Sequence, residues 1–319
     1  MQLQNAARLV ALTIGVVLLV ILISSYNFGG AIRALVQLKS VYFLTAILAF
    51  IAYTLLRYLP WAYIMRRVRI RMGILHSFLM MQAYFNLAML PLIYQFISLK
   101  HLSRFKKNAH LFSGSIIIST GLTGFLGLVF MALFASFFVS VFIPYVIALA
   151  IVLYLSMSFL GRDRFVGRVI SFIRSLNRRF KSKLIHAGLG YLENIRKTGA
   201  FLSQKDILVE TASYFPLLIC ENLFVYFLLL AFDQQVSLFS VIFFFSLADM
   251  IGLLSLLPLS LGSLDLSFIA FMTIIGVPGV IGLSVILIYR LFMNIILPLF
   301  GYGCLVSLDF LTRENLIRQ

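Results

Sequence analysis

The sequence has few charged residues. Only 11% of its 319 residues are Asp, Glu, Lys or Arg, against about a quarter in ordinary soluble domains. Together with the hydrophobic content of 62%, this excludes a soluble globular domain and a disordered chain. It also argues against nucleic-acid binding, because a basic groove needs a soluble polar surface around it.

The sequence also lacks the motifs of common metal, nucleotide and nucleophile sites. Its two cysteines, Cys220 and Cys304, lie inside apolar runs without a CxxC partner, and its four histidines are scattered. There is no HExxH, P-loop, GxSxG or dinucleotide fingerprint. We therefore expect no catalytic residue, no metal and no cofactor, and we interpret the cysteines as small apolar packing residues.

The chain does contain long apolar runs. A helix that spans the hydrocarbon core of a membrane takes about 20 apolar residues. The runs predict an all-α, polytopic integral membrane bundle of about six full spans with two opposed re-entrant hairpins. The first run is interpreted as a retained span, because no clean cleavage site follows it. The Phe243–Phe245 run is expected to face lipid. The six predicted spans are 9–23, 42–65, 110–134, 138–160, 207–231 and 280–308.

The distribution of basic residues predicts the orientation. Most of the 26 Lys and Arg residues lie in the segments 66–71, 100–107 and 162–205, and basic segments next to spans stay cytoplasmic. We expect an inner (cytoplasmic) membrane protein with cytoplasmic basic loops and both termini on that side. The expected parts are a membrane half over 1–161, a basic cytoplasmic segment over 162–206 and a second membrane half over 207–319.

Two apolar stretches are better explained as broken hairpins than as straight spans. Residues 74–99 lie between two basic clusters on the same side, and Asn86–Pro91 supplies a break because proline disfavours helix. Residues 238–277 are interrupted by Pro258–Gly262 and enter from outside if the C-terminal tail is cytoplasmic. Opposed broken helices are typical of transporters built from inverted repeats.

The basic segment begins with an amphipathic pattern. Its apolar residues recur every three or four positions from Phe165 to Leu184, and basic residues fill the other face. Two interpretations remain open: a helix that binds anionic lipid at the membrane surface, or a solvated helix that packs on the protein. The residues expected at the membrane surface are Arg174, Arg178, Arg179, Lys181 and Lys183.

Polar and ionisable side chains within apolar spans are functional candidates, since burying them in lipid is costly. We expect Arg290 to form an ion pair with Asp249 or Asp265, or to bind a phosphate with its planar fork. The two interpretations are compatible if lipid phosphate displaces a carboxylate during transport. Glu221 is a candidate for proton or ion coupling. The predicted substrate-binding residues are Arg290, Asp265, Asp249, Asn86, Gln95 and Asn294.

The C-terminal third carries an ordered set of motif residues: Pro258, Gly262, Asp265, Gly276-Val277-Pro278, Tyr289-Arg290 and Leu297-Pro298-Leu299. With this set the chain resembles the lysylphosphatidylglycerol synthase transmembrane-region, or flippase-domain, family. The segments Arg57–Arg67 and Asn86–Pro91 are also similar to that family, and the resemblance extends over about residues 10–310.

The sequence departs from the family pattern at several positions. Ile93–Phe96 stands where the family has Arg-x-Gly-Glu, and Asp265 replaces a glutamate. The soluble aminoacyl-transfer domain of two-domain members does not follow, so we expect no aminoacyl-lipid synthesis and no enzyme. The resemblance implies translocation of an anionic phospholipid or a polyprenyl-linked sugar between leaflets.

The alternative is a non-transporting accessory subunit of a glycosyltransferase or of a pathway for surface polysaccharide or lipid modification. Membrane lipids are the expected partners in the first case. A homodimer and a complex with a biosynthetic enzyme are both compatible with the sequence.

Overall fold

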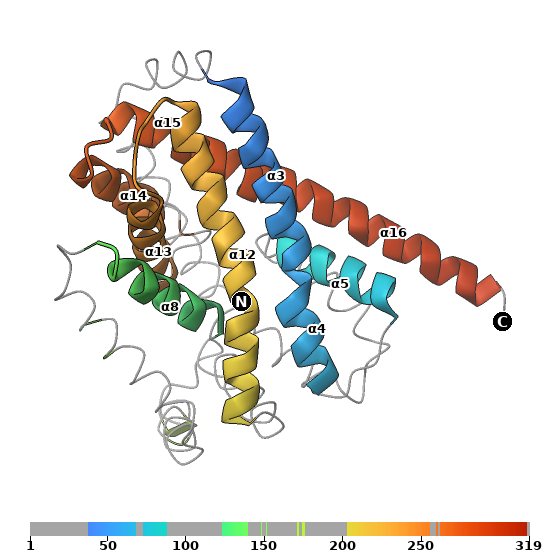
Figure 1. Ribbon diagram of the computed structural model, residues 1–319. Helices are drawn as coiled ribbons and strands as arrows, with labels where there is room; N and C mark the ends of the chain where they lie inside the picture. The colour runs from blue at the N-terminus through green and yellow to red at the C-terminus, as the bar shows by residue number, and fades with distance from the viewer. Residues whose placement is uncertain are drawn as a thin grey trace.

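The described part of the chain is helical throughout (Figure 1). The computed structural model describes residues 38–67, 73–87, 123–139, 203–255, 260 and 262–317, with the single residues 148, 151, 171, 174 and 175. The helices are α3 (Ser40–Leu56), α4 (Tyr58–Arg67), α5 (Ile74–Leu87), α8 (Gly124–Ser136), α12 (Gln204–Ala231), α13 (Leu238–Leu254), α14 (Ser263–Ile274), α15 (Gly279–Leu291), the π-helical η5 (Phe292–Ile296) and α16 (Leu297–Ile317).

Three segments are long and apolar enough to cross a membrane: Ser40–Arg67, Lys205–Ala231 and Gly279–Leu308. They coincide with three of the six predicted spans, and the shorter helices between them are also apolar. The predicted class, an all-α helical membrane bundle, is therefore confirmed. Several predicted parts lie outside the described residues: the first span, the start of the span over 110–134, most of the span over 138–160, the second limb of the 74–99 hairpin and most of the basic segment. Arg174 is described and exposed.

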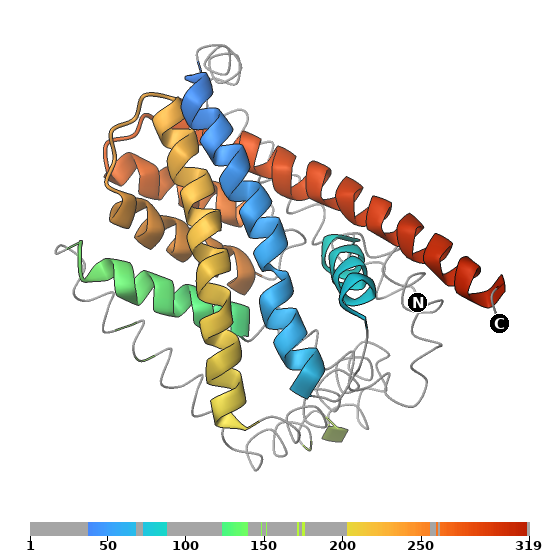
Figure 2. The ribbon, with the colours of Figure 1, turned by 45° about the vertical axis from the view of Figure 1, so that its right-hand side comes forward.

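The seam between α3–α4 and α12 runs along the bundle (Figures 1 and 2). At one end the amide of Lys39 donates to the carbonyl of Ala231 at 2.9 Å, and Lys39 Nζ pairs with Asp233 at 2.6 Å. At the other end Arg67 pairs with Asp206, which also accepts a hydrogen bond from the Tyr63 hydroxyl. The two segments are therefore antiparallel. Arg67, in the basic cluster 66–71, and Asp206, the last residue of the basic segment 162–206, lie at the same end of the bundle.

Helix α12 begins at that end because Ser203 and Asp206 form a capping box. The Asp206 amide donates to Ser203 Oγ at 3.2 Å, and the Ser203 amide donates to Asp206 Oδ2 at 2.9 Å. Such reciprocal bonds satisfy amide groups that have no partner within the first helical turn. Asp206 thus sets the start of α12 and its contact with α4 at once.

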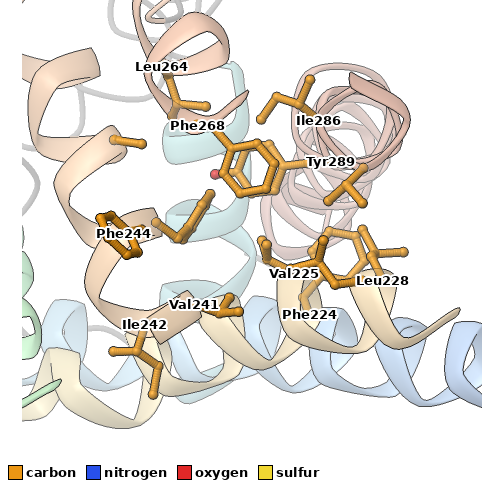
Figure 3. Close-up of a cluster of buried hydrophobic side chains, with 14 of the residues drawn as sticks. Phe224, Val225, Leu228, Val241, Ile242, Phe244, Leu264, Phe268, Ile286 and Tyr289 are labelled. Atoms are coloured by element: carbon orange, nitrogen blue, oxygen red, sulfur yellow. The ribbon is translucent and has the colours of Figure 1, made fainter. Parts of the chain in front are cut away.

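Aromatic and branched side chains from α12, α13, α14 and α15 fill the core (Figure 3). The Phe224 and Phe292 rings lie 5.2 Å apart, and the Phe245 ring meets Phe268 edge-on at 5.8 Å. The expectation that Phe243–Phe245 faces lipid is wrong, because all three side chains are at most 1% exposed. Helix α13 packs against α8, α12 and α14, so protein covers the faces that a peripheral helix would turn to lipid.

The predicted interruption of residues 238–277 is confirmed. Helix α13 ends at Leu254 and α14 begins at Ser263, and Gly262 near the break has a φ of +80°. The two helices pack as an antiparallel hairpin, since Phe244 contacts Phe271 while Gly252 lies beside Leu264. Such positive φ values are readily adopted only by glycine.

The last span contains a π-helical turn. The Leu297 amide donates to the Phe292 carbonyl, five residues back. Pro298 has no amide hydrogen, so the ordinary helical pattern is interrupted at this point. The chain continues without a turn into α16, which packs against α5 and extends beyond it to the C-terminus (Figure 2).

Close packing at the hairpin predicts that Gly252→Ala destabilises the fold. A methyl group at Gly252 would lie 3.0 Å from Ser260 Cβ and 3.1 Å from Leu264 Cβ. We expect a loss of about 1–3 kcal/mol, as for other overpacked sites, measured as a lower thermal transition in detergent. Gly303→Ala is the matched control, because nothing lies within 4 Å of the added methyl group. Equal stability of the two variants would contradict the proposed packing.

Candidate functional site: a charged cluster beside the hairpin break

The ion pair predicted for Arg290 is present, and its partner is Asp265. Arg290 Nε lies 2.7 Å from Asp265 Oδ1, and the two side chains are 15% and 6% exposed. Arg290 belongs to α15 and Asp265 to the first turn of α14. The contact therefore fixes the second limb of the hairpin to the last span, as the structural interpretation of Arg290 expects.

The same two side chains also bind the interrupted backbone. Asp265 Oδ2 accepts the Gly262 amide at 2.9 Å, and Arg290 Nη2 donates to the Ser260 carbonyl at 3.0 Å. Interrupted backbone inside a membrane is tolerated where protein satisfies its polar groups. We call this set of contacts among Ser260, Gly262, Asp265 and Arg290 the break clamp.

A hydrogen bond from Tyr289, the residue that precedes Arg290, links Glu221 to the break clamp. The Tyr289 hydroxyl donates to Glu221 Oε1 at 2.7 Å, and the Glu221 side chain is 6% exposed. The Tyr289 ring is held by an edge-on contact with Phe245 at 5.3 Å (Figure 3 shows Tyr289). One helix, α15, thus contacts an acidic residue on α12 with one side chain and an acidic residue on α14 with the next.

Two further charged side chains, Asp249 and Arg57, complete the cluster electrostatically. Asp249 on α13 interacts with both Glu221 and Arg290. Arg57, at the junction of α3 and α4, interacts with Glu221 and lies over the Tyr53 ring, 5.5 Å from its centroid. The described charged cluster therefore contains three carboxyls (Glu221, Asp249 and Asp265) and two guanidinium groups (Arg57 and Arg290).

The structure brings together only part of the predicted site. Asn294 lies in η5, one turn beyond Arg290, and is half-buried. Asn86 is in α5, where its side chain is not described, and Gln95 lies outside the described residues. The predicted contribution of the first hairpin thus stays a prediction.

The site includes three residues that were not predicted from the sequence: Tyr53, Arg57 and Tyr289. Arg57 lies within the predicted span 42–65 and Tyr289 directly precedes Arg290. These are weak signals that gain meaning only from the packing of α3, α12 and α15. In the described ranges, no three His, Cys, Asp or Glu side chains are grouped to hold a metal ion. The carboxyls of the cluster are instead arranged around arginines and a tyrosine.

The buried ion pair predicts strongly non-additive effects of substitution. Asp265→Asn or Arg290→Gln alone should cost about 3–5 kcal/mol, because each leaves the other side chain in a buried site without its partner. The double variant should be more stable than either single one, as seen by thermal unfolding in detergent. Asp233→Asn, which breaks the exposed pair with Lys39, should change little. Additive losses would show that the pair does not hold the break.

Two relatives from Methanothermobacter thermautotrophicus, both described as UPF0104 membrane proteins, are similar to parts of the chain. One is 37% identical over 71 residues, which cover 22% of this chain and 21% of the relative. The other is 28% identical over 148 residues, which cover 46% of this chain and 44% of the relative. The matched stretches therefore span less than half of each relative.

A family model covers far more of the chain. The model described as the lysylphosphatidylglycerol synthase transmembrane region matches residues 8–301. That range includes every described helix up to the start of α16, and it contains the whole charged cluster. The chain is therefore an integral membrane protein that belongs to the lysylphosphatidylglycerol synthase transmembrane-region family.

Proposed function

We propose that this protein moves an anionic phospholipid or a polyprenyl-linked lipid between the two leaflets of the inner membrane, and that it is not an enzyme. The observation that carries the proposal is Arg290, a nearly buried guanidinium placed beside broken backbone in a family of lipid-related membrane domains. Charged groups at membrane depth mark substrate pathways in many transporters.

The chemistry of Arg290 supports recognition of a phosphate. A guanidinium presents its N–H groups in a fork that matches carboxylate and phosphate oxygens equally well. Arg290 already holds a carboxylate oxygen at 2.7 Å and a carbonyl oxygen at 3.0 Å. In the proposed cycle a lipid phosphate replaces the Asp265 carboxylate on Arg290, and the lipid tails stay in the bilayer.

The remaining predicted residues have secondary roles in this proposal. Asn294, in the π-helical turn one helical turn beyond Arg290, would donate to headgroup oxygens; π-helical turns are frequent at functional sites. Asn86 and Gln95 would contribute from the first hairpin, and Asp249 would help hold Arg290 when Asp265 is displaced. The basic segments would lie on the cytoplasmic side, where anionic lipid attracts them.

The proposal predicts that Arg290→Ala slows lipid translocation by about tenfold or more, since a charge-assisted hydrogen bond contributes about 1.5–3 kcal/mol. The measurement is the rate at which a fluorescent phosphatidylglycerol, and separately a lipid-linked sugar, crosses vesicles that contain the purified protein. Arg290→Lys keeps the charge that faces Asp265 but lacks the fork, so it should stay folded while translocation remains slow.

Arg66→Ala is the control for loss of an arginine, because Arg66 is exposed at the far end of α4. It should translocate lipid like the wild type. Unchanged translocation by folded Arg290→Ala protein would remove the assigned role of Arg290. A wild-type protein that moves no lipid and co-purifies with a stoichiometric biosynthetic enzyme would overturn the proposed function in favour of an accessory subunit.

A further inference from the structure

We propose that the hydrogen bond between Tyr289 and Glu221 is an anchor that keeps α15 on α12 while a lipid phosphate replaces Asp265 on Arg290. The inference rests on the proposed function, because it assigns positioning residues to the same phosphate site. Tyr289 and Glu221 do not touch the phosphate in this cycle. They hold the helix that carries Arg290, so that the guanidinium stays in place when its partner changes.

Helix α12 is held at both ends and in the middle by the first long segment of the bundle. At its last residue, the Ala231 carbonyl accepts the Lys39 amide at 2.9 Å, and in its first turn Asp206 is bonded to α4. Between these ends the Phe224 ring lies 5.6 Å from the Phe50 ring of α3. A helix held at three levels is a suitable base for an anchor.

The end of α15 packs on this base through one hydrogen bond and a group of rings (Figure 3). The Tyr289 hydroxyl donates to Glu221 Oε1 at 2.7 Å, and the Tyr289 and Phe224 rings lie 6.3 Å apart. Three residues further along the chain, the Phe292 ring lies 5.2 Å from Phe224 and 4.9 Å from Phe50. Residues three apart lie on one face of a helix, so one turn of α12 meets one turn of the last span.

Arg290 leaves α15 in a different direction. Successive residues of an α-helix are rotated by about 100° around its axis, and Arg290 directly follows Tyr289. The Arg290 side chain binds Asp265 Oδ1 at 2.7 Å and the Ser260 carbonyl at 3.0 Å. Adjacent side chains therefore attach the same helix to two different parts of the bundle, α12 and the hairpin break.

The two attachments differ in how readily a phosphate can replace them. The Arg290 guanidinium binds carboxylate and phosphate oxygens with the same fork, and its side chain is 15% exposed. Tyr289 and Glu221 are each 6% exposed, and Phe245 packs edge-on against the Tyr289 ring at 5.3 Å. A phosphate therefore competes with the Asp265 carboxylate for the more accessible group, while the Tyr289–Glu221 bond stays covered by protein.

The anchor needs an oxygen acceptor at position 221 and not a carboxyl. The side-chain amide of glutamine offers a carbonyl oxygen to the Tyr289 hydroxyl, whereas leucine offers none. Proton or ion coupling by Glu221, the role predicted from the sequence, would need the carboxyl itself. The variants Glu221→Gln and Glu221→Leu therefore distinguish the two roles.

The first test is the translocation of fluorescent phosphatidylglycerol in vesicles that contain the intact protein. Tyr289→Phe and Glu221→Leu should each slow translocation about fivefold or more, as expected for the loss of one buried hydrogen bond. Glu221→Gln should stay close to the wild type. Tyr63→Phe is the matched control, because it removes a hydroxyl from another carboxylate, Asp206, at the far end of α12. It should translocate lipid like the wild type.

The double variant Tyr289→Phe/Glu221→Leu separates positioning from stability. It leaves no buried polar group without its partner at this contact, so it should be more stable in thermal unfolding than either single variant. Its translocation should remain as slow as theirs, because the bond is still absent. A folded double variant that translocates like the wild type overturns the anchor, and so does folded Glu221→Gln protein that is as slow as Glu221→Leu.

The second test reads the anchor without transport. Spin labels are placed, in a variant without the two natural cysteines, at exposed positions on three helices: Ile219 of α12, Ile274 of α14 and Leu291 of α15. The α12–α15 distance should be the same in vesicles of phosphatidylglycerol and of digalactosyldiacylglycerol, which has no phosphate, whereas the α14–α15 distance should differ. Tyr289→Phe should broaden the distribution of α12–α15 distances.

The outcomes separate the two proposals. An α12–α15 distance that changes with the lipid in the wild type, or that Tyr289→Phe leaves unchanged, overturns the anchor. A wild-type protein that moves no lipid, or an α14–α15 distance that is the same in both lipids, contradicts the proposed function. In that case the α12–α15 distances in the wild type and in Tyr289→Phe decide the anchor on their own.

Discussion

The arrangement of this bundle depends on how the break between two apolar helices satisfies its backbone. Polar backbone groups that are buried must find partners in the protein. Asp265 binds the Gly262 amide with one oxygen and Arg290 with the other, and Arg290 reaches the Ser260 carbonyl. The hairpin can turn here because these two side chains satisfy the backbone groups that the break leaves without helical partners.

The cluster around the break is possible because the rest of the core is apolar and tightly packed. Phenylalanine rings from α12, α13, α14 and η5 meet at centroid distances of 5 to 6 Å, so the core of the bundle is closely packed. The Lys39–Asp233 pair at one end of the seam contributes little to stability, since both charges face water. Its position at that end helps to set the register of the two segments.

Those parts of the fold that follow from local chemistry could be predicted from the sequence. The break near Pro258–Gly262 and the pairing of Arg290 follow from the properties of proline and glycine and from the cost of an isolated charge. The Tyr289–Glu221 bond and the approach of Arg57 could not, because their partners are far apart in sequence. The burial of Phe243–Phe245 was missed for a similar reason: hydrophobicity alone does not distinguish a face toward lipid from a face toward another helix.

The strength of the Arg290–Asp265 pair does not argue against a role in transport. Removing one partner of a buried pair is costly because it leaves a charge without compensation, whereas exchanging one oxyanion for another leaves the guanidinium paired throughout. In the proposed cycle a phosphate could therefore displace Asp265 without leaving Arg290 unpaired. The displaced carboxylate would keep the Gly262 amide as its partner, so the hairpin would keep its turn while the contact between Asp265 and α15 is released. The interaction that stabilises the resting bundle would thus be the one that a lipid headgroup replaces.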